Sequence, residues 1–159
     1  MFRAMRRAKQ QLNKKETLAI LEAGSYGTLA CLGDDAYPYA IPLNYVYLDN
    51  RIYMHSAKQG HKVDAIANHR KVSFTVVGQD QIVSKEYTTY FSSVIAFGRA
   101  RLAEGDEYTR AFTALTDKYA SDRPKQERIE QIRGCSQAII IAIDIDHLSG
   151  KQAKELSQK

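Results

Sequence analysis

The chain has 159 residues, of which 44% are hydrophobic and 26% are charged, a balance typical of a soluble globular protein. This length suits one domain with a sizeable core, so we expect residues 1–159 to form a single domain. No apolar run approaches the length needed to cross a bilayer, which argues against an integral membrane protein. The formal net charge is +5, so nucleic acid and membrane surfaces have to be weighed as partners.

Part of the positive charge lies in the N-terminal segment, residues 1–13. No apolar segment follows it, so a secretory signal is not expected, and its cations are not interleaved with aromatics that would stack on bases. We therefore interpret this segment as a solvated basic arm and predict binding to neither nucleic acid nor membranes. Cys31 and Cys135 are the two cysteines, and without a CxxC motif they indicate a reducing, cytoplasmic environment.

The first expected element is a helix over residues 13–24. Asn13 is a good N-cap with Glu16 three residues later, which is close to a capping box, and Gly24 is a typical helix stop. Residues 26–32 then have the composition of a strand, so the chain is expected to begin with a helix followed by a β-strand.

Residues 37–48 alternate between bulky side chains on one face and smaller ones on the other, which predicts a strand. Pro38 and Pro42 cannot donate to a central ladder, so part of this strand is expected at a sheet edge or in a bulge. The bulky face comprises Tyr37, Tyr39, Ile41, Leu43, Tyr45 and Tyr47.

Residues 49–50, Asp-Asn, predict a two-residue hairpin turn into a strand over residues 51–57, because both residues tolerate positive φ. The numbers of paired residues then sum to 99, and the paired side chains share a face. That face would be small and polar, a surface on which a flat ligand could lie. The expected pairs are Asn44 with His55 and Pro42 with Ala57.

Beyond residue 57, the expected order is a helix, two strands, two helices and a final strand. The expected elements are helices over residues 61–70, 106–120 and 123–134, and strands over residues 71–78, 87–105 (kinked near Gly98) and 137–148. Six short strands with few helices predict a mainly β (α+β) fold, an antiparallel barrel with peripheral helices.

The connection from Ser56 to Lys62 is small, polar and cationic. Gly60 permits close backbone approach, and the free N–H groups of the helix start that follows attract anions. His61 and Lys62 add donors that would suit a phosphate monoester. From these residues alone, a phosphate cradle and an ordinary solvated connection both fit. No GxGxxG, Walker, HExxH or GxSxG motif is present, and the histidines lack zinc-ligand spacing.

Four segments occur in order along the chain: GSYGTLAC, YPYAIPLNYVY, IYMHSAKQGHKVD and SVIAFGRARL. Together they resemble the nitroimidazole-resistance (Nim) branch of the pyridoxamine 5'-phosphate oxidase-like flavoproteins, from about residue 14 to residue 150. The resemblance implies a six-stranded antiparallel FMN-binding split β-barrel. It also implies a homodimer with FMN at the subunit interface. Independently of the resemblance, we interpret residues 151–159 as a solvated C-terminal tail.

The resemblance further implies where the flavin would lie. The basic end of HSAKQGHK would hold the phosphate, which gives Lys62 a phosphate role with His61 beside it. Many relatives have Arg where this chain has His61, so a bidentate clamp would be weaker here. The other implied cofactor contacts are Pro42, Leu43, Asn44 and Tyr45 along the ring, His55, Ser56 and Ala57 beside it, and Ser93 and Val94 near the interface.

The implied activity is redox chemistry on the flavin. NADH or NADPH would reduce the FMN, which would in turn reduce a small aromatic acceptor such as a nitroaromatic ring. His55 would be the catalytic residue, donating a hydrogen bond or proton near flavin or substrate. The alternative for His55 is a strand histidine that only bonds a neighbour.

Two other interpretations remain open. The first is a pyridoxamine 5'-phosphate oxidase proper, although no second phosphate-binding arginine cluster is evident. The second is a non-catalytic flavin- or haem-binding protein, since split barrels host either use. In a haem-binding protein, His147 or His55 would be the axial ligand.

Overall fold

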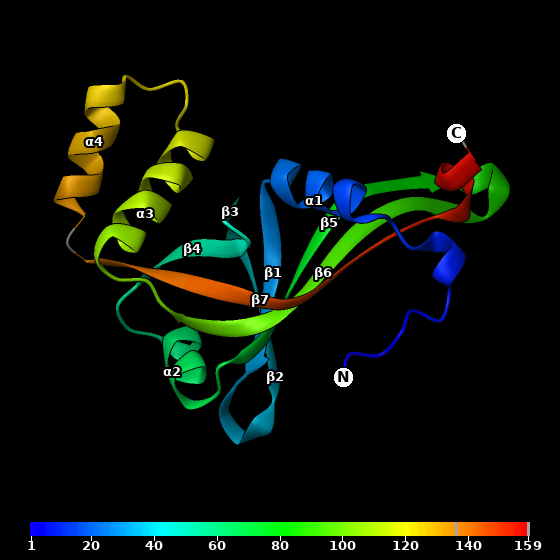
Figure 1. Ribbon diagram of the computed structural model, residues 1–159, viewed down its shortest axis with the longest axis horizontal. Coiled ribbons are helices and arrows are strands. Elements are labelled where there is room, and N and C mark those ends of the chain that lie inside the picture. Colours follow the sequence, from blue (N-terminus) through cyan, green and yellow to red (C-terminus); the bar gives the residue numbers. More distant parts are fainter. Residues whose placement is uncertain (136, 159) are drawn as a thin grey trace.

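The structure is a computed structural model that describes residues 1–135 and 137–158. Seven strands form one antiparallel sheet in the order β2-β1-β5-β6-β7-β4-β3, with helices around it (Figure 1). The strands are Tyr26–Leu32 (β1), Pro38–Asn44 (β2), Val46–Leu48 (β3), Arg51–Ala57 (β4), Lys71–Val83 (β5), Thr88–Leu102 (β6) and Ala138–Gln152 (β7). The α-helices are Lys14–Ala23 (α1), His61–Asn68 (α2), Gly105–Tyr119 (α3) and Lys125–Gly134 (α4), and the 3-10 helices are Ala8–Gln10 (η1), Asp34–Ala36 (η2), Ser84–Glu86 (η3) and Lys154–Gln158 (η4).

The segment 37–48, predicted as one strand, forms two strands that lie at opposite edges of the sheet. β2 pairs with β1 at one edge, and β3 pairs with β4 at the other. Because one continuous segment supplies both edges, it joins them across the gap and curls the sheet into a split barrel. The predicted mainly β split-barrel fold is confirmed, with seven strands instead of six, and the prolines of β2 do lie in an edge strand.

Burial of Tyr45 accounts for the break between β2 and β3. Its side chain is fully buried, and its hydroxyl donates to the carbonyl oxygen of Leu21 at 2.5 Å. Its backbone N–H and C=O are bound by the hydroxyl of Tyr119 rather than by a neighbouring strand. The chain therefore changes sheet edge here without leaving unpaired backbone groups.

The two-residue turn at 49–50 is confirmed, because Asp49 and Asn50 have φ angles of 50° and 59°. Its ladder, however, is only three pairs long, since the chain departs from β4 at Tyr45. The two predicted pairs that lie beyond this point are therefore wrong. Asn44 pairs with Tyr26 instead of His55, and Pro42 pairs with Thr28 instead of Ala57.

The predictions made from local signals in the sequence are also confirmed for the two ends of α1 and for the bend of β6. Asn13 and Glu16 form the capping box, with both hydrogen bonds at 2.9 Å, and Gly24 ends the helix. The β6–β7 register shifts between Phe97 and Gly98. A Cβ at Gly98 would collide with the carbonyl oxygen of Asp144, so glycine permits this close strand approach.

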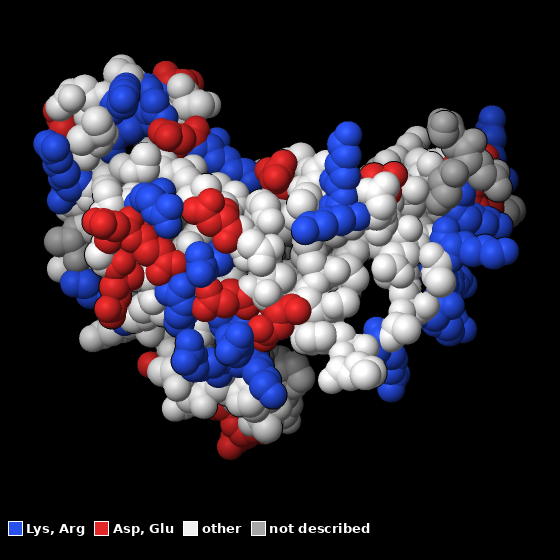
Figure 2. All heavy atoms as spheres, in the orientation of Figure 1, with Lys and Arg blue, Asp and Glu red and all other residues white. Residues whose placement is uncertain are grey.

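The helices and the surface charge divide the molecule into two ends. Helices α2, α3 and α4 lie at the end that contains β3 and β4, and both chain termini lie at the other end (Figure 1). On the face drawn in Figure 2, charges of both signs cover the first end, whereas Lys and Arg predominate at the end with the termini. No helix within residues 1–135 and 137–158 is long and apolar enough to span a membrane.

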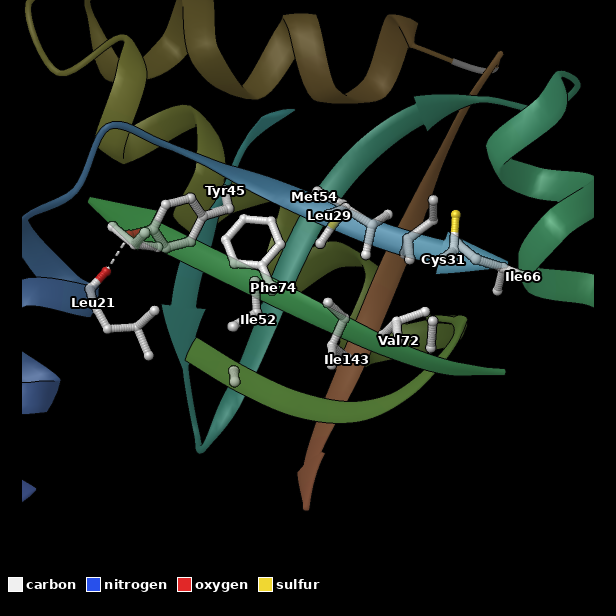
Figure 3. Close-up of a cluster of buried hydrophobic side chains, with 14 of the residues drawn as sticks. Leu21, Leu29, Cys31, Tyr45, Ile52, Met54, Ile66, Val72, Phe74 and Ile143 are labelled. Atoms are coloured by element: carbon white, nitrogen blue, oxygen red, sulfur yellow. Dashed lines mark hydrogen bonds between the residues drawn. The ribbon is translucent and has the colours of Figure 1, made fainter. Parts of the chain in front are cut away.

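The buried side chains form two clusters on opposite sides of β4. Ile52 and Met54 point into the barrel, where they join Phe74 and Leu29 (Figure 3). Tyr53 points to the other side, where α3 packs on the sheet. The residues of this second cluster are Tyr53, Ala103, Ala111, Leu115, Ile140 and Ala142. Since successive strand residues face opposite ways, His55 projects toward the helices and Ser56 toward the barrel.

Candidate functional site

His55 is exposed near the end of β4, on the side of the strand that faces α3 and α4. It lines a cavity of about 350 Å³ between the sheet and these helices. Asn44, at the end of β2, lines the same cavity, so the structure brings the two residues together although they are not strand partners. The complete lining is Asn44, His55, Phe112, Leu115, Thr116, Tyr119, Ala120, Gln131, Ile132 and Cys135.

The cavity is apolar on its helical wall and polar at a few points of its rim. Phe112, Leu115 and Ile132 supply the apolar wall, whereas His55 and Asn44 place donors at the sheet side. Pockets of this kind accommodate flat, mainly apolar molecules and orient them through a small number of polar contacts. The arrangement suits a single aromatic ring that carries a polar substituent.

Tyr119 holds the sheet side of this cavity in place. Its hydroxyl accepts from the N–H of Tyr45 at 2.9 Å and lies 2.7 Å from the carbonyl oxygen of Tyr45 and 2.6 Å from that of Ser25, so its single proton can be shared between these two oxygens. The side-chain amide of Asn44 donates to the same Ser25 oxygen at 2.9 Å. These bonds fix Asn44 relative to α3, so the cavity wall is connected to the point where β2 ends.

Lys118 is a second link between α3 and the barrel. Its ammonium group donates to the carbonyl oxygen of Gly24 at 2.6 Å and lies 4.4 Å from the centre of the Tyr45 ring. Burial lowers the pKa of Lys118, and burial also raises the pKa of the Tyr45 phenol. Neither group lines the cavity, so we interpret both as structural.

The connection between β4 and α2 has the geometry of an open helix start. Gly60 has a φ of 131°, and no atom lies within 4 Å of the position that a Cβ would occupy. The carbonyl oxygen of Gly60 accepts from the N–H groups of Val63 and Asp64, which leaves the N–H groups of His61 and Lys62 outside the helical ladder. This end can therefore receive an anion.

Side chains around this helix start differ in availability. Lys62 is half-buried, and no hydrogen bond or ion pair joins it to the described residues. His61 stacks on Tyr39 at 4.1 Å between ring centres, and its Nε2 lies 3.7 Å from the Asp34 carboxylate. The Ser56 hydroxyl is buried without a hydrogen-bond partner among the described residues. Lys62 and Ser56 are thus two groups, among the residues that the structure describes, that a ligand at this helix start could pair with.

The other predicted contacts fall into three groups. The side chains of Tyr45 and Val94 are fully buried in the core, so only their backbone atoms could contact a cofactor. Leu43 packs against the same core, whereas Pro42 and Ala57 are exposed. Of these five residues, Pro42 and Ala57 present side chains that a flavin ring could touch.

Ser93 lies far from the cavity within one chain. His55 pairs with Ile140 of β7, whereas Ser93 pairs with Lys151 of the same strand. The eleven residue-to-residue steps from 140 to 151 correspond to roughly 35 Å along the strand. The structure therefore does not bring the 93–94 segment and His55 into one site within a single chain.

The helical wall of the cavity was not predicted from the sequence. Phe112, Leu115 and Tyr119 form an apolar stripe along α3, and the first two of them belong to the cluster that packs on the sheet. All three residues also line the cavity, together with Ile132 of α4. The polar Thr116 next to this stripe is the one sequence signal that could have indicated a ligand.

Comparison with known proteins places this geometry in a family. The model of the pyridoxamine 5'-phosphate oxidase family matches residues 13–152. The chain therefore belongs to that family, which confirms the family suggested by the four segments. An uncharacterized protein of Rhizobium meliloti (strain 1021) is 28% identical over 149 residues, which cover 89% of this chain and 93% of the relative.

Two solved structures share the fold at low sequence identity. A candidate 5-nitroimidazole antibiotic resistance protein from Bacteroides thetaiotaomicron has a TM-score of 0.76 and 18% identity, covering 89% of this chain and 86% of its own. The FAD and heme binding protein from Mycobacterium smegmatis has a TM-score of 0.71 and 19% identity, covering 91% of this chain and 73% of its own. At these identities the likeness establishes the fold alone.

Proposed function

We propose that this protein is an FMN-dependent oxidoreductase that reduces a small aromatic acceptor, such as a nitroaromatic, with electrons from NADH or NADPH. The observation that carries the proposal is the position of His55 and Asn44 at the rim of an apolar cavity of about 350 Å³. The family of the chain, and the names of the Bacteroides and mycobacterial neighbours, support a flavin and a nitroaromatic acceptor.

The residues at the start of α2 fit the phosphate of FMN. Ser56 has a buried hydroxyl without a partner, Lys62 has a free ammonium group, and Gly60 leaves the backbone open to close approach. A phosphate would satisfy the hydroxyl and the free N–H groups of the helix start together. His61 would take a smaller part, because it is stacked on Tyr39 and faces the Asp34 carboxylate.

The bound flavin would supply the two-electron redox chemistry, and the protein would supply binding and orientation. The apolar wall of Phe112, Leu115 and Ile132 would exclude water from an aromatic acceptor. His55 would donate a hydrogen bond or a proton from its ring nitrogen to an oxygen of the acceptor. Asn44, held by Ser25, would fix the orientation of the ring beside it.

A homodimer would complete this site. The distance of Ser93 from His55 along β7 means that both can contact one flavin only when they come from different copies. The outer face of β1, β5 and β6 offers the surface for such contact, because Tyr26, Val77 and Ile95 are 60%, 58% and 38% exposed there. Exposed apolar patches of this sort mark protein interfaces.

The first experiment is an absorption spectrum of the purified protein with the released cofactor identified by mass. A flavin spectrum with the mass of FMN supports the proposal, and bleaching by NADPH followed by reoxidation with a 5-nitroimidazole would establish the activity. A colourless protein that takes up no added FMN would remove both the cofactor and the redox function.

The name of the mycobacterial neighbour suggests haem binding as a competing function. His147 is poorly placed as an axial ligand, because its ring stacks on Phe2 with 4.7 Å between centres. His55 remains free for such a role at the cavity rim. A Soret band in place of flavin absorption would favour this alternative.

A further inference from the structure

A second cavity, of about 670 Å³, lies at the end of the sheet that carries both termini (Figure 1). It is formed by the segment before and within η1, by the start of β6, and by the start of η4. Its lining is Arg6, Arg7, Ala8, Lys9, Gln10, Thr88, Thr89, Phe91, Ala153, Lys154 and Glu155. None of these residues belongs to the site described above.

The lining is strongly cationic. Arg6, Arg7 and Lys9 line the cavity, and none of them forms an ion pair with the residues that the structure describes. Lys154 adds a fourth cation, partly offset by the Glu155 carboxylate at 3.7 Å. Figure 2 shows Lys and Arg gathered at this end of the molecule. Four cations around one hollow raise the local concentration of anions and favour a phosphate-bearing ligand.

A buried amide gives an independent indication of a ligand. Gln10 is only 8% exposed, yet its side-chain carbonyl oxygen has no hydrogen-bond partner among the described residues. Its backbone is fixed on both sides. The N–H of Gln10 donates to the carbonyl oxygen of Arg7, and Gln11 forms an antiparallel β-bridge with Lys151. A buried acceptor of this kind is costly unless a donor reaches it. A ligand that combines anionic groups with an N–H or O–H donor would pair both with the cations of the cavity and with the Gln10 oxygen.

The aromatic ring of Phe91 adds a third recognition element. It lines the cavity and already carries the Lys151 ammonium 5.2 Å from its centre. Phosphate groups, an aromatic base and an exocyclic amine occur together in a nucleotide, and aromatic side chains bind bases by stacking. The combination therefore favours a nucleotide over a simple inorganic anion.

We propose that this cavity binds the adenosine-phosphate half of the nicotinamide dinucleotide that reduces the flavin. The identity of the dinucleotide rests on the proposed function, whereas the nucleotide site rests on the cavity itself. Phe91 precedes Ser93 by two residues, which is about 7 Å along β6. A dinucleotide anchored by its phosphates here would extend past Ser93, the residue expected to face the flavin of the other subunit.

The test is calorimetric titration of the full-length protein, as purified, with ADP at low ionic strength. Removing two cations in Arg6→Ala/Arg7→Ala should weaken ADP binding about tenfold or more, since charge-assisted bonds to phosphate are lost. Both arginines are exposed, so the fold should survive. The matched control is Lys14→Ala/Lys15→Ala, which removes two exposed cations of α1 outside the cavity and should leave ADP affinity unchanged.

Four results would overturn the inference. Three of them are binding results: no ADP binding at millimolar concentration, equal weakening of ADP binding in the Arg6/Arg7 and Lys14/Lys15 variants, or tighter binding of a single-stranded oligonucleotide than of ADP. The fourth is a kinetic result, an unchanged KM for the dinucleotide in Arg6→Ala/Arg7→Ala. ADP binding is measured without turnover. A protein that lacks flavin but binds ADP through Arg6 and Arg7 would keep the nucleotide site and lose the proposed redox function.

Discussion

The hydroxyl of Tyr119 lies within hydrogen-bonding distance of both backbone polar groups of Tyr45, 2.9 Å from its nitrogen and 2.7 Å from its oxygen. Tyr45 marks the point at which the chain passes from one edge of the sheet to the other. One side chain of α3 thus replaces the strand partner that Tyr45 lacks. The same side chain lines the cavity beside His55, so one residue contributes both to the closure of the barrel and to the shape of the candidate site.

Tyr119→Phe is therefore expected to lower the free energy of unfolding by about 1–3 kcal/mol, because it leaves buried backbone groups unpaired. Urea denaturation measures this change. Tyr108→Phe is the matched control on the same helix, since the Tyr108 hydroxyl makes one longer bond of 3.3 Å to Ala138. Equal stability losses in the two variants would contradict the role given to Tyr119.

Lys62→Ala should lower FMN occupancy, because Lys62 is the free ammonium group at the start of α2. Loss of one charge-assisted bond to a phosphate should weaken FMN binding by about tenfold. The ratio of flavin to protein absorbance after dialysis reports the occupancy. Lys71→Ala, an exposed lysine at the start of β5, is the control and should retain FMN. Full occupancy in Lys62→Ala would place the phosphate elsewhere.

His55→Ala should leave FMN content unchanged and reduce kcat for a nitroaromatic by about 10²-fold or more, as expected when a proton donor is lost. Steady-state kinetics and the flavin spectrum of the same preparation measure the two quantities. His69→Ala, an exposed position at the end of α2, serves as control and should behave as wild type. If turnover in His55→Ala is also unchanged, His55 is a strand residue without a catalytic role.

Ile95→Asp should convert a dimer into monomers, because it places a charge on the outer face of β6, where Ile95 is 38% exposed. Burying an unpaired charge in an interface costs several kcal/mol. Light scattering after size-exclusion chromatography gives the mass. Thr113→Asp adds the same charge at an exposed position of α3 and should leave the mass unchanged. A dimeric Ile95→Asp variant would exclude this face as the interface.

Local signals in the sequence predicted local structure well. The capping box at Asn13, the turn at residues 49–50 and the bend at Gly98 each depend on interactions within a few residues or on glycine itself. The division of residues 37–48 was missed because alternation continues through Tyr45. Only contacts with Leu21 and Tyr119, distant in sequence, turn this position into a break.

The candidate site was predicted only in part, because it too depends on contacts between residues that are distant in sequence. His55 and Asn44 were expected together as a strand pair, but the correctly predicted hairpin ladder ends at Val46 and Tyr53, and the two residues meet instead at the rim of the cavity. The helical wall of the cavity was not predicted, since the amphipathic pattern of α3 does not reveal which of its apolar residues face a cavity, and Thr116 alone is a weak signal. The proposed contact of Ser93 with the flavin rests on the proposed dimer, because within one chain Ser93 and His55 pair with distant residues of β7.

An ion network at the base of α3 makes stability depend on pH. Glu107 accepts from Arg101 at 2.7 Å and 2.8 Å and from the Tyr53 hydroxyl at 2.9 Å. These hydrogen bonds, that of Arg101 foremost, hold the pKa of Glu107 below its usual value of 4.5. Asp144 also accepts hydrogen bonds from Arg101 and from Arg51. The pKa of Asp144 is lowered mainly by the hydrogen bond from Arg101.

A carboxylate whose pKa is lower in the folded state stabilises the fold above its unfolded pKa, and this stabilisation is lost as the pH falls through the folded value. Glu107→Gln should therefore be less stable than wild type at neutral pH, by about 1–3 kcal/mol for a charge-assisted pair. The difference should shrink as the pH falls below about 4.5, because protonation then neutralises Glu107 in the wild type as well. Urea denaturation at several pH values measures it.

Glu127→Gln is the matched control for this prediction. Glu127 pairs with Arg123 one turn away on α4, where both side chains are substantially exposed, so its loss should change stability little at any pH. A stability difference between wild type and Glu107→Gln that stays constant from neutral pH to acid would contradict the lowered pKa. The network would then stabilise α3 through the shape and hydrogen bonding of Glu107 rather than through its charge.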